Sequence, residues 1–365
     1  MKKSEKKRNS TDCERGQIRS FISHSKPTLT SKDIETITKV MQSDMIATGD
    51  KTAEFEDKAA SYLGLKGGVA TSSGTSALFL SLKSIGICKG DEVVIPTYVC
   101  PTVLYAVEKT GAVPILCDVG DDWLMSSDTV KPHLSSKTKA IIAPHIGGIA
   151  IDIKPLTKLG VPVIEDLAQA FGVEINGHKA GTFGQITICS FKAIKCLTTG
   201  EGGMILSNDE SILKKIRQIK IFSPMSDLQA ALGLNQLKQY PSFLKRRLEI
   251  ADVYFKAFNN FSGICMPRSL RKRSMFFRFP LRIPINFEIL KSEFEKEGIA
   301  VRQFIDFLLH RILKQPSNIF PNAEKHFKET LSIPIYPSLS DDEVEYIVKA
   351  CDQILTKHLG RQRQL

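Results

Sequence analysis

The stretch SFKAIKCLTTGEGG, residues 190–203, places a hydroxyl, two lysines and a glycine-rich bend close together. It follows the apolar run Ile186–Cys189, which is typical of a buried strand, and it leads into a second such run at 203–206. A lysine reacts as a nucleophile when its amine is partly desolvated or lies near other positive charge, because the neutral form is then populated. Most lysines are solvated surface residues, and that is the favoured interpretation for either of these lysines taken alone. Lys195, with apolar neighbours on both sides, is the better candidate for a reactive amine.

Short apolar runs of the same kind alternate with helical patterns along the first two thirds of the chain. Nearly continuous apolar runs separated by helices are what a parallel sheet covered on both faces requires. We therefore expect a layered α/β domain. Its predicted strands lie at 68–70, 92–95, 113–118, 140–144, 162–166, 186–189 and 203–206.

The chain divides into three predicted parts. Residues 1–25 are polar and basic with little to pack, and we expect a flexible N-terminal extension. Residues 26–240 hold the seven strand candidates of the layered domain, and helical spacing begins there at Ser31, which we expect to be an N-cap. Residues 241–365 form a smaller predicted domain. Its clearest elements are a strand-like run and an amphipathic helix, at 277–283 and 341–355.

Two further segments place polar chemistry at the ends of predicted strands. Ser73–Leu78 is a small-residue turn before a helix, where free N–H groups favour phosphate, although most such turns are ordinary N-caps. Glu165 and Asp166 end a strand at the edge where open α/β sheets bind ligands, and alternation should bring only one of them to a site. Asp166 either keeps a cationic ring nitrogen protonated or caps the next helix. His145 has no companion at ligand spacing, and we interpret it as structural.

Composition restricts the class of protein. No apolar run in the 365 residues approaches the ~20 that a spanning helix needs, and no apolar segment follows the basic start, so a cytoplasmic protein is expected. The formal charge is +11, but the basic clusters at the two ends of the chain and at 271–273 are not interleaved with aromatic residues, which favours a solvated basic surface or a small anionic substrate over nucleic acid. The eight cysteines contain no Cys-x-x-Cys pair and no zinc spacing, so no metal site is expected.

Taken together and in this order, the motifs resemble the DegT/DnrJ/EryC1/StrS family of sugar aminotransferases. The resemblance runs from about Lys26 to the end, and its most specific part is SFxxxKxLTTGEGG at 190–203. It implies the aspartate aminotransferase-like fold, fold type I of the pyridoxal-phosphate-dependent transferases. This fold has a mixed sheet of about seven strands and a smaller C-terminal α+β domain. Supporting motifs are SGT at 73–75, GDEV at 90–93, IEDxAQA at 164–170 and DLQAALG at 227–233.

The resemblance also implies a role for each matching residue. Lys195 would carry pyridoxal 5'-phosphate (PLP) as a Schiff base and move the proton, and Asp166 would pair with the pyridine nitrogen. The spacing to the glycine-rich bend selects Lys195 over Lys192. The remaining cofactor-binding residues would be Gln169 at the ring hydroxyl, Ser190, Gly74 and Thr75 at the phosphate, and Cys100 where the family usually stacks an aromatic ring on the cofactor.

The implied activity is transfer of an amino group from an amino acid, glutamate, to a nucleotide-linked keto-sugar by a homodimer, in polysaccharide or antibiotic sugar biosynthesis. Two departures leave alternatives open. Cys100 offers little area for stacking. The short segment Ile221–Pro224 replaces a longer loop, whose Asn reaches the phosphate of the neighbouring subunit in family members. The alternatives are a related PLP-dependent sugar dehydratase or cyclising enzyme, and a non-catalytic regulatory protein that keeps the fold.

Overall fold

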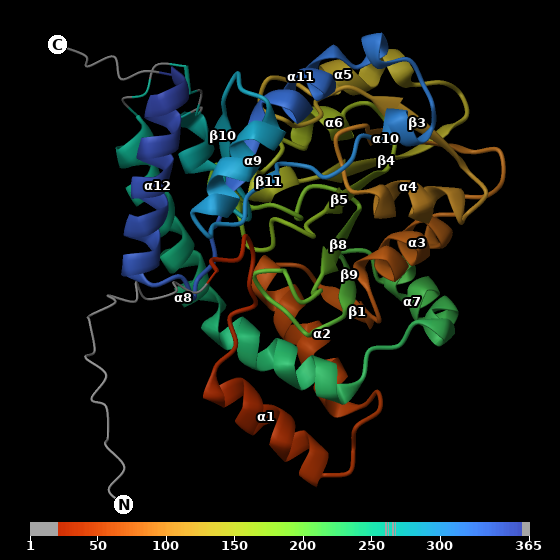
Figure 1. The fold of residues 1–365 in the computed structure, drawn as a ribbon. Helices are drawn as coiled ribbons and strands as arrows, with labels where there is room; N and C mark the ends of the chain where they lie inside the picture. Colours follow the sequence, from red (N-terminus) through yellow and green to blue (C-terminus); the bar gives the residue numbers. More distant parts are fainter. Residues whose placement is uncertain (1–20, 260, 262, 265, 267, 360–365) are drawn as a thin grey trace, which may run out of the picture.

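The computed structural model describes residues 21–359 except for 260, 262, 265 and 267 (Figure 1). Most of the predicted extension, 1–25, lies outside the described residues. Within its last part, Ile22 is buried and forms a parallel bridge with Ile299, and His24 shares a 2.9 Å hydrogen bond with Ser332. The chain is therefore packed against the C-terminal part from Ile22 onward.

A seven-stranded mixed sheet forms the centre of the larger part, with strand order β1-β9-β8-β5-β4-β2-β3. β9 runs antiparallel to both of its neighbours, so the expectation of a purely parallel sheet is wrong at this strand, and the mixed sheet is confirmed. The reason is the connection: the glycine-rich bend joins β8 to β9 without the crossover helix that parallel neighbours need. The strands are β1 Gly67–Thr71, β2 Glu92–Pro96, β3 Val113–Cys117, β4 Thr138–Pro144, β5 Val163–Asp166, β8 Ile186–Ser190 and β9 Gly203–Ser207.

Helices cover both faces of this sheet (Figure 1). Because alternate residues of β1 point to opposite faces, Ala70 belongs to the core cluster that includes α2, whereas Val69 belongs to the cluster that includes α3, α4 and α7. These helices span α2 Asp50–Leu63, α3 Gly74–Ser84, α4 Pro101–Glu108, α5 Ser127–Val130, α6 Lys154–Thr157 and α7 Glu210–Ile219. The minor elements here are β6 Glu174–Ile175, β7 His178–Lys179, and the 3₁₀ turns η1 Lys131–His133, η2 Ile146–Gly148 and η3 Lys220–Phe222.

Helix α1, Ser31–Gln42, begins where the sequence pattern placed it, but its N-cap is Thr30 and not Ser31. Thr30 and Asp33 form a capping box, in which the Asp33 carboxylate accepts the Thr30 N–H at 2.8 Å. Asp33 also accepts a 2.7 Å hydrogen bond from Asn235, which ties α1 to helix α8, Asp227–Phe258. The cap therefore also fixes α1 against the rest of the molecule.

Helix α8 links the large part to a smaller C-terminal part. It continues across the predicted boundary at 240/241 with Pro241 inside it, and the domain boundaries stay predictions. The smaller part has an antiparallel sheet of order β10-β12-β11, and the predicted strand at 277–283 and helix at 341–355 are confirmed. Its elements are η4 Arg268–Lys272, β10 Phe279–Arg282, α9 Phe287–Lys296, β11 Arg302–Gln303, α10 Leu309–Ile312, η5 Ser317–Ile319, α11 Pro321–Glu329, β12 Thr330–Ile333 and α12 Asp341–Leu359.

Within the described ranges, no helix has both the length and the apolar content that crossing a bilayer requires. The six cysteines of that part of the chain are free thiols, and four of them are buried.

Candidate active site

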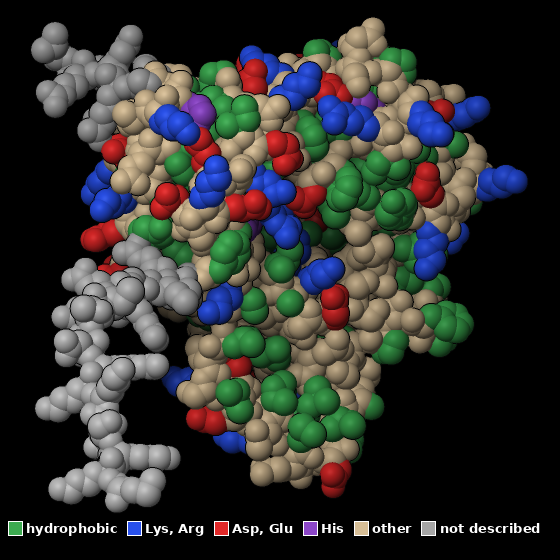
Figure 2. All heavy atoms as spheres, in the orientation of Figure 1, with side chains coloured by type: hydrophobic (Ala, Val, Ile, Leu, Met, Phe, Trp, Pro, Cys, Tyr) green, Lys and Arg blue, Asp and Glu red, His purple; other side chains and the backbone are tan. Residues whose placement is uncertain are grey.

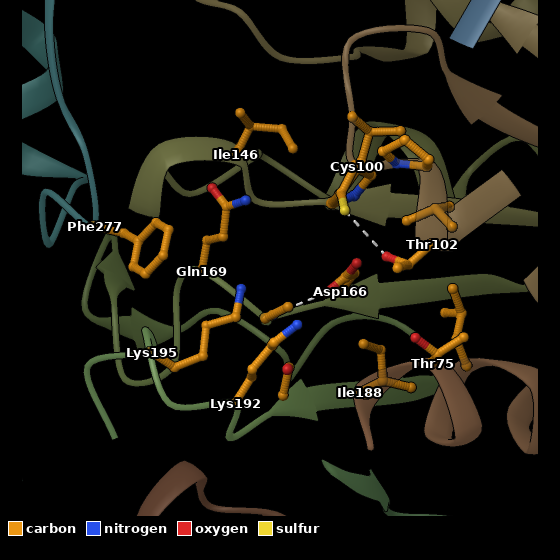
Figure 3. A pocket seen from close by; sticks show the side chains of 18 of the residues that line it. Thr75, Cys100, Thr102, Ile146, Asp166, Gln169, Ile188, Lys192, Lys195 and Phe277 are labelled. Carbon is orange, nitrogen blue, oxygen red and sulfur yellow. Dashed lines mark hydrogen bonds between the residues drawn. The ribbon is translucent and has the colours of Figure 1, made fainter. Parts of the chain in front are cut away.

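A pocket lies where β5 and β8 end and where α3 begins, with the smaller part of the chain closing one side (Figure 3). Parallel strands end together at one edge of the sheet, so this position is where ligands bind in open α/β sheets. The pocket brings together every residue that the sequence predicted for the site: Lys195, Asp166, Gly74, Thr75, Cys100, Gln169 and Ser190.

Lys195 lies in the turn after β8, where its backbone N–H donates to the carbonyl of Lys192 at 2.8 Å. Burial lowers the pKa of its amine from 10.5 to about 8, against the opposing effects of Asp166 and Cys100. At pH 7 roughly a tenth of such amines are neutral, whereas an ordinary lysine is almost entirely protonated. The Lys195 ammonium also lies 4.9 Å from the centre of the Phe277 ring. The structure therefore gives Lys195 the desolvated amine that nucleophilic chemistry requires.

Asp166 ends β5 with its carboxylate in the pocket, and its Oδ1 accepts the N–H of Ala168 at 2.8 Å. Burial raises its pKa, while the Ala168 N–H and the charge of Lys195 oppose that shift. Glu165 points the other way and accepts the N–H groups of residues 181, 183 and 184. Of the two acids only Asp166 lines the pocket, as the alternation along the strand predicts, and it also caps the following turn.

His145 lines the pocket beside Asp166, so it is less isolated than the sequence indicated. Its Nδ1 accepts the N–H of Ile151 at 2.9 Å, so the proton is on Nε2, which donates to Glu165 at 3.2 Å. Burial alone would raise the pKa of Glu165, but the His145 hydrogen bond and backbone donors hold it below its ordinary value. A neutral imidazole and a buried carboxylate thus form a fixed wall behind Asp166. The sequence contains one signal for this pair: Glu165, next to Asp166 in the strand, is a second acid that needs a partner of its own.

The N-terminus of α3 forms one end of the pocket. Ser73 caps the helix, since its Oγ accepts the N–H of Ser76 at 3.1 Å. The N–H groups of Gly74 and Thr75 precede the first intrahelical bond and have no acceptor elsewhere in the described residues. A Cβ atom at position 74 would lie 2.7 Å from the Cβ of Ser190, so only glycine lets the strand end and the helix start approach this closely. The result is a cradle of donors suited to a phosphate.

Gln169 and Cys100 lie on opposite sides of the pocket (Figure 3). The Gln169 Oε1 accepts the N–H of Gly147 at 2.7 Å, so its amide NH₂ remains as a donor to the pocket. Cys100 is exposed to the pocket, and its sulfur accepts a hydrogen bond from Thr102 at 3.3 Å. Both side chains therefore line the pocket, and Gln169 presents a free donor to it.

Several pocket residues from the smaller part were missed by the sequence motifs. Arg278 donates to the carbonyl oxygens of residues 303 and 304 and to the Asp306 carboxylate, which holds the loop with Asp306 and Phe307 at the pocket rim. Phe277 precedes Arg278 and faces Lys195. The strand-like run at 277–283 was visible in the sequence, but its contact with a pocket over eighty positions upstream follows from tertiary packing alone.

The chain has known relatives along almost its whole length. A sequence profile of the DegT/DnrJ/EryC1/StrS aminotransferase family matches residues 27–352. The chain belongs to this family. The spore coat polysaccharide biosynthesis protein SpsC of Bacillus subtilis is 31% identical to it, over 92% of this chain and 97% of SpsC. The GDP-perosamine synthase of Escherichia coli O157:H7 is 30% identical, over 91% of this chain and 98% of that enzyme.

Solved structures of aminotransferases have the same fold. The aminotransferase TlmJ from Streptoalloteichus hindustanus superposes with a TM-score of 0.88 at 29% identity, covering 92% of this chain and 99% of TlmJ. The PLP-form of the sugar aminotransferase Spr1654 from Streptococcus pneumoniae, described as putative, gives a TM-score of 0.87 at 26% identity, over 92% and 99% of the two chains. The predicted aspartate aminotransferase-like fold and the prediction of an aminotransferase are therefore confirmed.

Proposed function

We propose that this family member binds PLP in the pocket and transfers an amino group from glutamate to a nucleotide-linked keto-sugar. The observation that carries the proposal is the buried amine of Lys195, with a pKa of about 8, directed into a pocket that also contains Asp166 and a cradle of N–H donors. The relatives are in agreement, because one is named a GDP-perosamine synthase and one solved neighbour is a PLP-form.

The residues of the pocket fit PLP by their chemistry. When bound, PLP supplies an electrophilic carbonyl and a ring that withdraws electrons from the reacting carbon. Lys195 has the amine that would attach to that carbonyl and later move a proton at the substrate carbon. Asp166 would keep the ring nitrogen protonated by its negative charge, and the Gln169 NH₂ would donate to the ring hydroxyl. Ser190 and the N–H groups at the start of α3 would hold the phosphate.

The first test measures the cofactor and the donor together. The purified protein incubated with PLP should show visible absorbance that decreases when glutamate is added and returns when a keto-sugar acceptor is supplied. Glutamine and alanine should be compared as donors, and mass spectrometry of a panel of nucleotide-linked keto-sugars should show an aminated product. A protein that stays colourless after reconstitution, or coloured but unresponsive to any donor, would contradict the proposed enzyme.

A homodimer is the assembly that we propose, on the basis of an exposed apolar patch near the pocket. Ile221 is 73% exposed and Phe222 is 94% exposed, and Met45 on a neighbouring segment is 70% exposed. The two segments are connected, because Thr48 donates to the carbonyl of Met225, three residues after the end of η3, at 2.6 Å. On the face drawn in Figure 2, hydrophobic side chains also gather over the lower part of the molecule, where α1 and the start of α8 lie. Such a patch marks an interaction surface.

The patch gives a prediction about assembly. Ile221→Asp should weaken the dimer about 100-fold or more, because a charge without a partner would be buried at the interface. Analytical ultracentrifugation over a range of concentrations measures the change. Ile289→Asp is the matched control, since Ile289 is 50% exposed on α9 and should leave the dimer intact. Equal sedimentation of the two variants and the unmodified protein would place the interface elsewhere.

A further inference from the structure

Three basic side chains line the pocket, and two of them already interact with the protein. Arg278 donates to the carbonyl oxygens of residues 303 and 304 at 2.5 and 2.7 Å, and to Asp306 at 3.1 Å. Lys195 is attracted by the negative charge of Asp166. The positive charges of Arg278 and Lys195 are therefore already balanced by carboxylates and carbonyl groups of the protein.

Lys192 is the third basic side chain, and within the described residues its ammonium has no hydrogen-bond or ion-pair partner. It is exposed, and Figure 3 shows its end directed into the pocket, beside Lys195 and toward Asp166. A cation that points into a pocket without a partner of its own is suited to an anionic group of the ligand. The roles proposed for Lys195 and Asp166 therefore give no reason for a lysine at position 192 of the pocket.

Other hydrogen-bond donors that line the same pocket indicate which anion Lys192 binds. Ser190, two positions earlier, and Thr75 both have hydroxyl groups that make no hydrogen bond within the described part of the chain, and the N–H groups of Gly74 and Thr75 are also without acceptors there. A phosphate has enough oxygen atoms to accept from several donors at once, in addition to pairing with an ammonium. The segment 221–224 contributes no side chain to the pocket lining, and Lys192 is the basic side chain of that lining without a partner in the described residues.

We infer that Lys192 binds a phosphate group of the ligand in this pocket, from within the same subunit. The inference rests on the proposed function, in which the phosphate belongs either to PLP or to the diphosphate of the nucleotide-linked sugar. Lys192 then has a role different from that of Lys195: its charge holds a phosphate, whereas the neutral amine of Lys195 reacts.

Calorimetric titration of the cofactor-free protein tests the inference. Lys192→Ala should weaken binding of its phosphate ligand about ten-fold, the usual effect of losing one charge-assisted hydrogen bond, and Lys192→Arg should restore most of the affinity. The ligands are PLP, pyridoxal without its phosphate, GDP and dTDP. Weaker PLP binding with unchanged pyridoxal binding assigns Lys192 to the cofactor phosphate. Weaker GDP or dTDP binding with unchanged PLP binding assigns it to the substrate diphosphate.

Two controls keep this test independent of folding and of the proposed function. Lys214→Ala removes an exposed lysine from α7, outside the pocket, and should change none of the four affinities. The inference is overturned if neither PLP nor the nucleotides bind more weakly to Lys192→Ala, or if pyridoxal loses as much affinity as PLP. If the unmodified protein does not bind PLP, the proposed function fails, and the GDP and dTDP titrations still decide the role of Lys192.

Discussion

Replacing Lys195 by alanine should lower the rate of amino transfer by about 10³-fold or more, because the variant loses both the amine that attaches PLP and the group that moves the proton. Burial lowers the pKa of this amine to about 8, whereas the pKa of Lys51 is raised by its hydrogen bond with Glu54. The direct measurement is peptide mass spectrometry after treating the PLP-loaded protein with borohydride. The modified peptide should contain Lys195 in the unmodified protein, and no such adduct should form in the variant.

The control is Lys192→Ala, which at saturating PLP should keep the borohydride-stable adduct on Lys195. The pH dependence provides a second control. Since the pKa of Lys195 is lowered to about 8, the neutral amine increases as the pH rises toward 8 and gains little above 9. Attachment of PLP to the cofactor-free protein should follow this curve, whereas an ordinary lysine would continue to gain reactivity up to pH 10 or above. An adduct on Lys192 instead of Lys195 would overturn the assignment of the reactive lysine.

The strands of the central sheet could be predicted from the sequence because each is a short, mainly apolar run, and all but the edge strand β3 are almost entirely buried. The run at 92–95 became β2, Glu92–Pro96, and the run at 186–189 became β8, Ile186–Ser190. The direction of β9 could not be predicted in this way. An apolar run has the same composition in a parallel and an antiparallel pair, and only the connection before it determines the direction.

Helix α8 is a case in which tertiary packing overrides a local sequence signal. The sequence predicts a domain boundary at 240/241, and proline disfavours a helix interior because it removes a backbone donor. The structure has one helix from Asp227 to Phe258, which packs against α1 and α2 at its start and against α12 further along. Buried side chains on both sides of Pro241, such as Tyr240 and Phe243, hold the helix together there. Tertiary packing thus outweighs the local cost of the proline.

The residues of the candidate site also divide into those that the sequence could predict and those that it could not. Its motif residues lie at or shortly after strand ends and at the starts of α3 and α4, and a sheet brings such positions to one edge whatever the intervening sequence. Phe277, Arg278 and Asp306 reach the pocket from the smaller part of the chain. Their place depends on contacts between segments far apart in the sequence, such as the hydrogen bond from the Arg278 N–H to the Gly147 carbonyl at 3.2 Å. The spacing of residues within a single segment cannot predict such long-range contacts.

Asp166→Asn should lower the turnover number by about 10²-fold or more, because asparagine keeps the shape of the side chain but not its negative charge. The asparagine oxygen can still accept the Ala168 N–H, so the end of β5 should stay folded. What is lost is the charge that keeps the ring nitrogen of the cofactor protonated. Steady-state kinetics at saturating PLP and glutamate measure the loss, and Asp166→Glu should recover part of it.

The same substitution should also change the titration of Lys195. The charge of Asp166 raises the pKa of Lys195 against the larger effect of burial, so removing that charge should move the pKa of Lys195 further down from about 8. Labelling of Lys195 by an amine-reactive reagent at a series of pH values, quantified by peptide mass spectrometry, shows the direction. Glu201→Gln is the matched control, since Glu201 is an exposed carboxylate of the same pocket that does not contribute to the pKa of Lys195. A full turnover number in Asp166→Asn, with an unchanged titration of Lys195, would remove Asp166 from the catalytic site.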